Sequence, residues 1–274
     1  MDRAEKNPEK PAVLVIAGHD PTGGAGIQAD IEALASQGCR AATVVTALTV
    51  QDTRGVQRFQ PVDPEFATAQ AQAILVDMPI AAIKIGMLGT ASMVHAVQAL
   101  LKQHPDLPIV LDPVLHGGGG GALSDSTVST AIRSQLLPLT TLATPNSPEA
   151  RRLAPEGTTP EECATRLLRT GCRSVLVTGT PETGDDVVHT LYETNGDTTR
   201  FRCPRLPGEY HGSGCTLSAA IAGRIALGEP LTKAVDRAQR YTWNTLQHAV
   251  RAGRGQLLPH RFYWQPAVNN ERKE

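Results

Sequence analysis

Short apolar runs alternate with longer segments of helical period along most of this 274-residue chain. Such alternation is typical of repeated strand–helix–strand units, in which helices cover both faces of a parallel sheet. The apolar runs are nearly continuous, as expected for strands that are buried on both faces. We therefore predict a single three-layer α/β/α domain with a mainly parallel central sheet. The strands are expected at 12–18, 41–48, 81–86, 108–112, 141–145 and 174–179, and the helices at 24–37, 64–77, 91–103, 126–137, 147–153, 161–170, 214–227 and 230–249.

The pattern changes in the last third of the chain. Two strand-like runs, DVVHTLYE (186–193) and TTRFRCP (198–204), flank the turn signal TNGD and predict an antiparallel hairpin at the edge of the sheet. We expect a polar N-terminal tail over 1–10, one domain over 11–250 and a C-terminal extension over 251–274.

Charge and composition argue against several classes of partner. The formal net charge is −1, the sequence pI is near 6.7, and Lys and Arg are scattered, so neither nucleic acid nor an anionic membrane is expected as a ligand. No apolar run approaches the roughly 18 residues of a membrane helix, and the first ten residues are polar, so we expect a cytoplasmic protein. The five cysteines include no C-x-x-C pair, so neither a disulfide framework nor a structural metal site is expected.

Ligands of open parallel sheets bind beyond the carboxyl ends of the strands, so the segments after the strands are the candidates. After the first strand, AGHDPTGGAGIQAD (17–30) contains glycines that let a ligand approach the backbone, and it opens a helix whose free N–H groups favour anions. A tight turn that requires glycine explains the same residues equally well. Asp30 either binds a donor or stabilises the positive end of the helix. Gln51 can read the edge of a heterocycle, although a solvated glutamine is the simpler interpretation.

Two later loops carry carboxylate and amide side chains. Asp112 ends an apolar strand directly before Pro113, and the glycines at 117–121 predict a flap or a phosphate-binding loop, with a hydrophilic turn as the alternative. Asn146 and Glu149 lie three residues apart across a helix start. This spacing fits either an N-cap pair or a site for magnesium and phosphate.

The stretch HGSGC (211–215) joins a glycine turn to a helix, with a thiol at the junction. Several backbone N–H groups converge there and favour developing phosphate charge. The positive field of the helix end is expected to stabilise the Cys215 thiolate and to lower the pKa of the thiol. The alternative is a small buried cysteine that starts a helix.

Taken in order, these loops resemble the ribokinase superfamily, and specifically the hydroxymethylpyrimidine/phosphomethylpyrimidine kinases of thiamine biosynthesis, with pyridoxal kinases as neighbours. The resemblance covers about residues 12 to 228. It rests on the ordered set AGHDPTGGAGIQAD, TALTVQDTRGVQ, KIGML (84–88), LDPV (111–114), LLPLTTLATPNSPEA (136–150) and HGSGCTLSAA. The resemblance implies a ribokinase-like fold, a homodimer, and ATP-dependent phosphorylation of 4-amino-5-hydroxymethyl-2-methylpyrimidine and then of its monophosphate.

The resemblance also implies roles for single residues. At the substrate end of the site, Gln51 would pair with the pyrimidine edge and Asp30 would contact the polar substituents of the ring. The pocket there would be lined by Gly18, Met87 and Val114.

The other end of the site is expected to hold ATP and Mg²⁺. Asn146 and Glu149 would support the metal and the nucleotide phosphates, with Asp112 nearby as a second metal-binding carboxylate. The anion hole would be formed by Gly212, Ser213 and Gly214. Cys215 stands where most ribokinase relatives have the aspartate that takes the proton of the substrate hydroxyl, a substitution typical of the pyrimidine kinases.

One departure from the family pattern concerns the nucleotide site. A strand of the family ends in a lysine that approaches the transferred phosphate, whereas Thr178 stands in its place within VTGTPETG. Arg54 and Lys84 are nominal substitutes that the sequence alone does not place. A kinase acting on pyridoxal or another hydroxymethyl heterocycle, and a weakly active or inactive pyrimidine-binding or sensor protein, therefore remain as alternatives.

Overall fold

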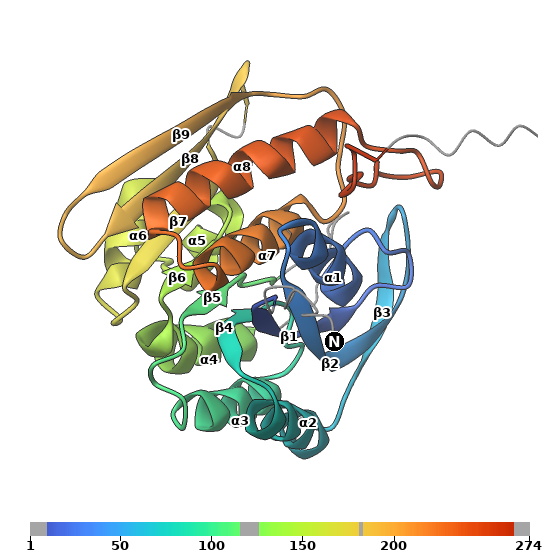
Figure 1. The fold of residues 1–274 in the computed structure, drawn as a ribbon. Coiled ribbons are helices and arrows are strands. Elements are labelled where there is room, and N and C mark those ends of the chain that lie inside the picture. Colours follow the sequence, from blue (N-terminus) through green and yellow to red (C-terminus); the bar gives the residue numbers. More distant parts are fainter. Residues whose placement is uncertain (1–9, 116–125, 181–182, 266–274) are drawn as a thin grey trace, which may run out of the picture.

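The computed structural model describes residues 10–115, 126–180 and 183–265. In these ranges one sheet of nine strands runs through the molecule, in the order β3-β2-β1-β4-β5-β6-β7-β8-β9 (Figure 1). The strands from β2 through β1 and β4 to β7 pair in parallel, and the pairs β2–β3, β7–β8 and β8–β9 are antiparallel. The strands are β1 (Ala12–His19), β2 (Arg40–Asp52), β3 (Gly55–Pro61), β4 (Ile80–Ile85), β5 (Ile109–Leu111), β6 (Leu142–Ala143), β7 (Ser174–Thr180), β8 (Asp186–Glu193) and β9 (Thr198–Pro204).

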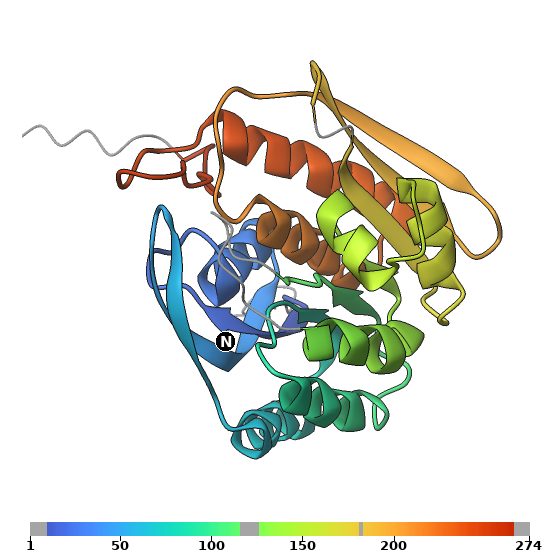
Figure 2. The ribbon, with the colours of Figure 1, turned by 180° about the vertical axis from the view of Figure 1, so that it is seen from behind.

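Helices cover both faces of the sheet, which gives the three layers predicted from the sequence (Figures 1 and 2). One face packs against α1 (Gly26–Ser36), α7 (Ser213–Ala226) and α8 (Leu231–Gln247). The other face packs against α2 (Pro64–Asp77), α3 (Ala91–Leu101), α4 (Ser126–Ala131), α5 (Ser147–Leu153) and α6 (Pro160–Leu168).

The central strand β1 shows why the sequence folds this way. Leu14 and Ile16 belong to the core under α2 and α3, whereas Val13 and Val15 belong to the core under α1 and α7. Alternate side chains of a strand point to opposite faces, so a strand buried on both faces must be apolar throughout. Each such side chain contributes about 1.5–3 kcal/mol when it is buried. The uninterrupted run AVLVIAG is therefore the signature of the middle of the sheet.

The predicted hairpin at the far edge is confirmed, because β8 and β9 pair antiparallel around the turn at 194–197. A second hairpin, β2–β3, was not predicted. The sequence predicts that this strand ends at residue 48, but β2 continues to Asp52 and turns back into β3. His19 of β1 pairs with Leu48, so the remainder of β2 extends beyond the sheet with both faces largely uncovered. Its mixed polar composition follows from that exposure.

The α-helix in this region is shorter than the predicted span 126–137. It is followed by a π-helical turn, which is wider than an α-helix, and then by a 3₁₀ turn, which is tighter. Regular α4 ends at Ala131, and Ile132–Leu136 forms a π-helical turn and Leu137–Leu139 a 3₁₀ turn. Pro138 cannot donate a backbone hydrogen bond, which explains why a regular helix does not continue there. The glycine run at 117–121 lies outside the described residues. In the part of the chain that the structure describes, no helix is long and apolar enough to cross a membrane.

The chain beyond residue 250 is tied to the domain in the described range. Val250 and Leu258 exchange backbone hydrogen bonds, and the Leu257 N–H donates to the Glu209 carbonyl. The Gln256 N–H donates to the carbonyl of Thr53 in the β2–β3 turn. The boundary at residue 250 remains an interpretation of the sequence, and residues 251–265 pack against the domain rather than away from it.

Candidate active site

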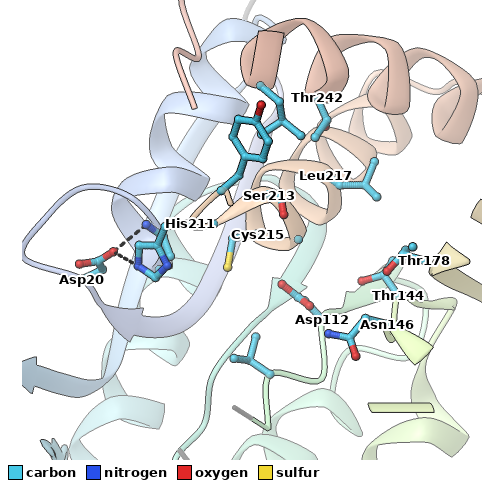
Figure 3. A pocket seen from close by; sticks show the side chains of 18 of the residues that line it. Asp20, Asp112, Thr144, Asn146, Thr178, His211, Ser213, Cys215, Leu217 and Thr242 are labelled. Atoms are coloured by element: carbon cyan, nitrogen blue, oxygen red, sulfur yellow. Dashed lines mark hydrogen bonds and ion pairs between the residues drawn. The ribbon is translucent and has the colours of Figure 1, made fainter. Parts of the chain in front are cut away.

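A cavity of about 470 Å³ lies beyond the carboxyl ends of the parallel strands, where open α/β sheets bind ligands (Figure 3). Its walls come from the loop after β1, the ends of β2 and β4 to β7, the β8–β9 hairpin, and the N-terminus of α7. Every predicted site residue except Asp30 lines it: Gly18, Gln51, Met87, Asp112, Val114, Asn146, Glu149, Thr178, Gly212, Ser213, Gly214 and Cys215.

One end of the cavity is a slot lined by the ends of β1 and β2 and by the segments after β4 and β5. A Cβ at Gly18 would lie 3.0 Å from the sulfur of Met87, so the absence of a side chain there lets the two walls approach. Gln51 is held at the rim because its Nε2 donates to Thr49 Oγ1 over 2.9 Å. Thr49 in turn donates to the carbonyl of His19. The slot thus combines an apolar floor with one oriented amide, as the recognition of a small heterocycle requires.

Asp30 lies beneath the cavity and not in its wall. Its carboxylate is fully buried and forms an ion pair of 2.8 Å with Nζ of Lys84, which is also fully buried. Burial raises the pKa of Asp30 to about 6, although Lys84 opposes the shift. Burial lowers the pKa of Lys84, but Asp30 and other acidic neighbours outweigh it and hold that pKa above the usual value. The predicted contact of Asp30 with a substrate ring does not fit this placement, because Lys84 occupies its carboxylate.

Two carboxylates stand near the middle of the cavity. Asp112 follows β5, is almost fully buried, and accepts a hydrogen bond from Ser218 Oγ over 3.3 Å. Glu149 begins α5, where it and Asn146 form a reciprocal N-terminal cap with distances of 2.9 and 3.0 Å. Burial raises the pKa of both carboxyls, and the charge of Asp112 helps to raise the pKa of Glu149 to about 8. The N-cap interpretation of Asn146 and Glu149 is therefore confirmed, and it leaves Glu149 facing a second buried acid.

These carboxylates fit a divalent cation whose remaining ligands come from phosphate or water. Two buried acids that raise each other's proton affinity are relieved by a cation between them, and oxygen ligands suit Mg²⁺. Among the described residues no group of three or more His, Cys, Asp or Glu side chains could hold a metal by itself. Nucleotide-bound Mg²⁺ typically uses one or two carboxylates, which matches Asp112 and Glu149.

The N-terminus of α7 faces the two acids across the cavity. Gly212 caps the helix at φ 79°, a left-handed conformation, and a Cβ there would overlap the carbonyl of Gly24. The following residues Ser213, Gly214 and Cys215 form the first turn, whose N–H groups have no partner within the helix. Cys215 and Asp112 both line the cavity here (Figure 3), and a Cβ at Gly214 would lie 4.0 Å from both carboxylate oxygens of Asp112. Helix N–H groups and a thiol thus meet at one point.

The expected lowering of the Cys215 pKa is wrong for this arrangement. Burial raises the pKa of the thiol to about 12, and the charges of Asp112 and Asp30 add to the effect. Lys84 and the backbone N–H of Gly26 act in the opposite direction but do not outweigh it. The cysteine is therefore a protonated thiol at neutral pH in this arrangement.

Sequence reasoning missed a buried pair that joins two walls of the cavity. Asp20 lies 3.0 Å from Nε2 of His211, and both side chains are almost fully buried. The same carboxylate accepts hydrogen bonds from the backbone N–H groups of Thr22 and Ala25, as Figure 3 shows for part of this network. Asp20 begins a glycine turn, which is a recognised role of aspartate, whereas no local signal marked His211.

The far end of the cavity lies between the end of β7 and the helix α8. Thr178 pairs with Asn146 in a short bridge at the end of β7, and Thr242 and Trp243 of α8 face the same space. His189 of β8 accepts the N–H of Gly179 at its Nδ1. Burial lowers the pKa of His189 to about 4, so the ring is neutral at pH 7 and carries its proton on Nε2. This end offers an apolar wall with polar side chains near Thr178.

A family model described as phosphomethylpyrimidine kinase matches residues 20–260 of the chain. The chain belongs to this family.

Curated relatives of the family share substantial identity with the chain. The thiamine biosynthesis bifunctional protein ThiED of Geobacter sulfurreducens is 40% identical over 249 residues, which make up 89% of this chain and 51% of that protein. The chain thus spans about half the length of this relative. The hydroxymethylpyrimidine/phosphomethylpyrimidine kinase of Escherichia coli is 40% identical over 215 residues, which make up 76% of this chain and 80% of that enzyme.

A solved structure shows the same fold outside the pyrimidine kinases. The pyridoxal kinase of Bacillus subtilis, determined as an ADP complex, superposes with a TM-score of 0.82 at 26% identity. The match covers 92% of this chain and 97% of that chain. The phosphomethylpyrimidine kinase family member described here therefore has the ribokinase-like fold, with the antiparallel strands at the sheet edges.

Proposed function

We propose that the chain uses ATP to phosphorylate 4-amino-5-hydroxymethyl-2-methylpyrimidine and then its monophosphate, a step of thiamine biosynthesis. The observation that carries the proposal is the meeting of the α7 N-terminus, Cys215 and Asp112 at the centre of one cavity. On one side of this centre lies the slot with Gln51, and on the other lies the end with Asn146 and Thr178. An acceptor alcohol and a triphosphate would enter from opposite sides and meet there.

The slot would hold the pyrimidine. Gln51 would pair with the polar edge of the ring, because its amide both donates and accepts. Gly18, Met87 and Val114 would contact the ring faces and the methyl group. The amide is already oriented by Thr49, which reduces the entropy lost when the substrate binds.

The α7 N-terminus would stabilise the phosphoryl group during transfer. The N–H groups of Gly212, Ser213 and Gly214 are fixed before the substrate binds, so they stabilise developing charge without reorganisation. Asp112 and Glu149 would hold Mg²⁺, which supplies charge neutralisation at the phosphate oxygens. Asn146 and Thr178 would contact the nucleotide phosphates.

Cys215 would accept the proton of the acceptor alcohol as a thiolate, after Mg²⁺ and ATP have neutralised Asp112 and the thiol has released its own proton to solvent. In a loose phosphoryl transfer the attacking oxygen needs little negative charge early, so a modest base in the correct position is sufficient. Lys84 and the Gly26 amide already act to lower the thiol pKa against burial. Lys84 also lines the cavity, and we propose that its buried ammonium group supplies the positive charge that Thr178 lacks.

A coupled assay of ATP consumption with the pyrimidine, its monophosphate and pyridoxal tests the proposal. Turnover of both pyrimidines with a higher kcat/KM than pyridoxal is the expected result. The likeness to a pyridoxal kinase structure makes pyridoxal the second candidate, and a preference for it would overturn the pyrimidine assignment. If no compound is turned over while one raises the melting temperature, the chain is a binding protein.

The assembly and location are further proposals. Leu48 and Val50 point from the same face of β2 and are 51% and 43% exposed, so a second copy that covers this hairpin would form a homodimer. Sedimentation velocity of the wild type and of Leu48→Asp tests this, because only the variant should sediment as a monomer. A cytoplasmic location is proposed on the same footing, and fractionation of cells would test it.

A further inference from the structure

The C-terminal segment 250–261 contacts three walls of the cavity although no motif marks it in the sequence. The Gly255 N–H donates to Thr53 Oγ1 in the β2–β3 turn, two residues from Gln51. Leu257 exchanges backbone hydrogen bonds with Glu209 and His211, directly before the α7 N-terminus. The segment therefore bridges the substrate slot and the helix end that faces the phosphate.

Arg261 closes this segment and is almost fully buried. Its guanidinium group donates to two carbonyls of the glycine loop, Gly23 over 3.1 Å and Gly24 by a short contact. Its Nε donates to Thr216 Oγ1 over 3.0 Å, on the first turn of α7. The planar guanidinium group thus donates hydrogen bonds to the glycine loop and to the α7 N-terminus at the same time. A lysine ammonium is a compact point charge and cannot reproduce this geometry.

The groups that Arg261 contacts are in turn connected to the Gly212 backbone and to the Cys215 thiol. The Thr216 hydroxyl donates to the carbonyl of Gly212 over 2.8 Å. On the other side of Arg261, the glycine loop continues to Gly26, which lines the cavity with Cys215 and whose backbone N–H acts to lower the pKa of that thiol. Moving Arg261 would therefore shift the Gly212 backbone and the Gly26 amide together.

A half-exposed carboxylate, Glu32, balances the charge of the buried Arg261. Its Nη1 lies 3.0 Å from Glu32 Oε2, and the Glu32 side chain is 45% exposed. The inner N–H groups, in contrast, meet only carbonyl and hydroxyl oxygens of the two active-site segments. The ion pair and the carbonyl contacts can therefore be tested separately.

We propose that Arg261 is a positioning residue that sets the distance between the glycine loop and the α7 N-terminus, and thereby places the Cys215 thiol and the anion-binding amides. The inference rests on the proposed phosphoryl transfer. It assigns a function to a segment that the family motifs do not include. Arg261 itself does not touch the cavity.

The test compares the full-length variants Arg261→Met and Arg261→Lys with the matched control Glu32→Gln. Steady-state kinetics at 20 °C give kcat and KM, and calorimetry gives the affinity for tripolyphosphate with Mg²⁺, which requires no turnover. We expect both Arg261 variants to lose about 10- to 100-fold in kcat, because a misplacement of about 1 Å at a reacting centre has effects of this order. KM for the pyrimidine should change less than about threefold, since the slot is intact. Tripolyphosphate should bind about tenfold more weakly, and Glu32→Gln should stay within about twofold in all measurements.

Chemical rescue separates positioning from folding. Methylguanidinium added to Arg261→Ala should restore part of kcat in a saturable manner, and it should not affect the wild type. A folded Arg261→Met or Arg261→Lys with wild-type kcat and tripolyphosphate affinity would overturn the inference. An equal loss of kcat and of tripolyphosphate affinity in Glu32→Gln would also overturn the inference. The effect of Arg261 would then come from its ion pair with Glu32 and not from its hydrogen bonds to the Gly23 and Gly24 carbonyls. If the wild type phosphorylates no alcohol, the proposed function fails. The affinity for tripolyphosphate then still decides whether Arg261 positions the amides. A wild type that does not bind tripolyphosphate would also overturn the inference.

Discussion

The state of Cys215 links the geometry of single residues to the proposed chemistry. Its thiol is protonated because burial and the charges of Asp112 and Asp30 raise its pKa to about 12. Ligands that bring positive charge to Asp112 act against this shift. Under the proposed function the thiol would therefore become a base only once Mg²⁺ and ATP are bound, and as a protonated thiol it would resist oxidation between turnovers, since the thiolate is the reactive form.

Replacement of this thiol should affect turnover more than binding. We expect Cys215→Ser to lose about 100-fold or more in kcat, the usual contribution of a positioned base, while the Kd for the pyrimidine changes little. Stopped-flow or steady-state kinetics together with calorimetry measure both quantities. Cys39→Ser makes the same thiol-to-hydroxyl change at a buried site that does not line the cavity, and it should leave kcat unchanged. Normal turnover in Cys215→Ser would reject the cysteine as the base.

The Asp20–His211 pair should make stability depend on pH. Burial acts to raise the pKa of Asp20, but hydrogen bonds from His211, Thr22 and Ala25 outweigh it and lower the pKa from 3.8 to about 2. Because the folded-state pKa is lower, the ionised carboxylate stabilises the fold above about pH 4, and this contribution disappears as the pH falls toward 2. Urea unfolding should show Asp20→Asn less stable than the wild type by about 1–2 kcal/mol at pH 7, with a smaller difference at pH 3. The exposed Asp106→Asn serves as the control, and a difference that is independent of pH would contradict the assignment.

At the scale of elements, the α7 N-terminus depends on a glycine for two separate reasons. Gly212 has a positive φ and no room for a Cβ, whereas Gly228 at the other end of α7 has φ 80° and nothing within 4 Å of a Cβ. Gly228→Ala should therefore cost only the left-handed conformation, about 1–2 kcal/mol of unfolding free energy. Gly212→Ala should cost about 2 kcal/mol more through overpacking against Gly24, and it should abolish most turnover. Chemical denaturation and kinetics of the two variants measure the difference, and equal losses would show that the close contact is unimportant.

The elements differ in how well the sequence predicts them, and the reason is physical. Central strands such as β1 are buried on both faces, so their composition alone identifies them. The hairpin β2–β3 is largely exposed, and its residues alternate without a strong apolar signal, so the sequence does not predict it. The turn at 194–197 was predictable because its Asn and Gly favour that geometry.

The candidate site shows the same division. Residues that touch the cavity from strand ends, such as Gln51, Asp112 and Cys215, could be predicted from the loop motifs. Lys84 and Asp30 could not be placed, because their pairing joins β4 to α1 across the core. Arg261 gave no signal at all, since all the partners of its guanidinium group lie far away in the sequence, and two of them are backbone carbonyls more than 230 positions away. Local sequence patterns do not contain contacts of this kind.

The sheet separates two cores, each covered by its own layer of helices (Figure 1). The cavity lies beyond the carboxyl ends of the parallel strands and is lined from several strand ends and from the α7 N-terminus. Asp112 follows β5 and Glu149 lies in the first turn of α5, which follows the neighbouring strand β6, whereas the opposing N–H groups come from α7 on one face. Ligands that bridge these groups should therefore stabilise the entire fold and not only one loop.

This coupling predicts a magnesium-dependent response of global stability to nucleotide. Mg²⁺ should bring ATP to the two acids, because burial, with the charge of Asp112 adding to it, raises the pKa of Glu149 to about 8 and a cation would offset both effects. At a ligand concentration about 100 times Kd, binding contributes about 2.7 kcal/mol, which corresponds to a melting temperature roughly 5–10 °C higher for a chain of this size. ATP with EDTA should give a much smaller shift, and in Asp112→Asn the shift should no longer depend on Mg²⁺. Scanning calorimetry with ATP, ATP with Mg²⁺ and ATP with EDTA measures these shifts, with Asp106→Asn as the surface control. Equal shifts with and without the metal in the wild type would show that the carboxylates do not take part in nucleotide binding.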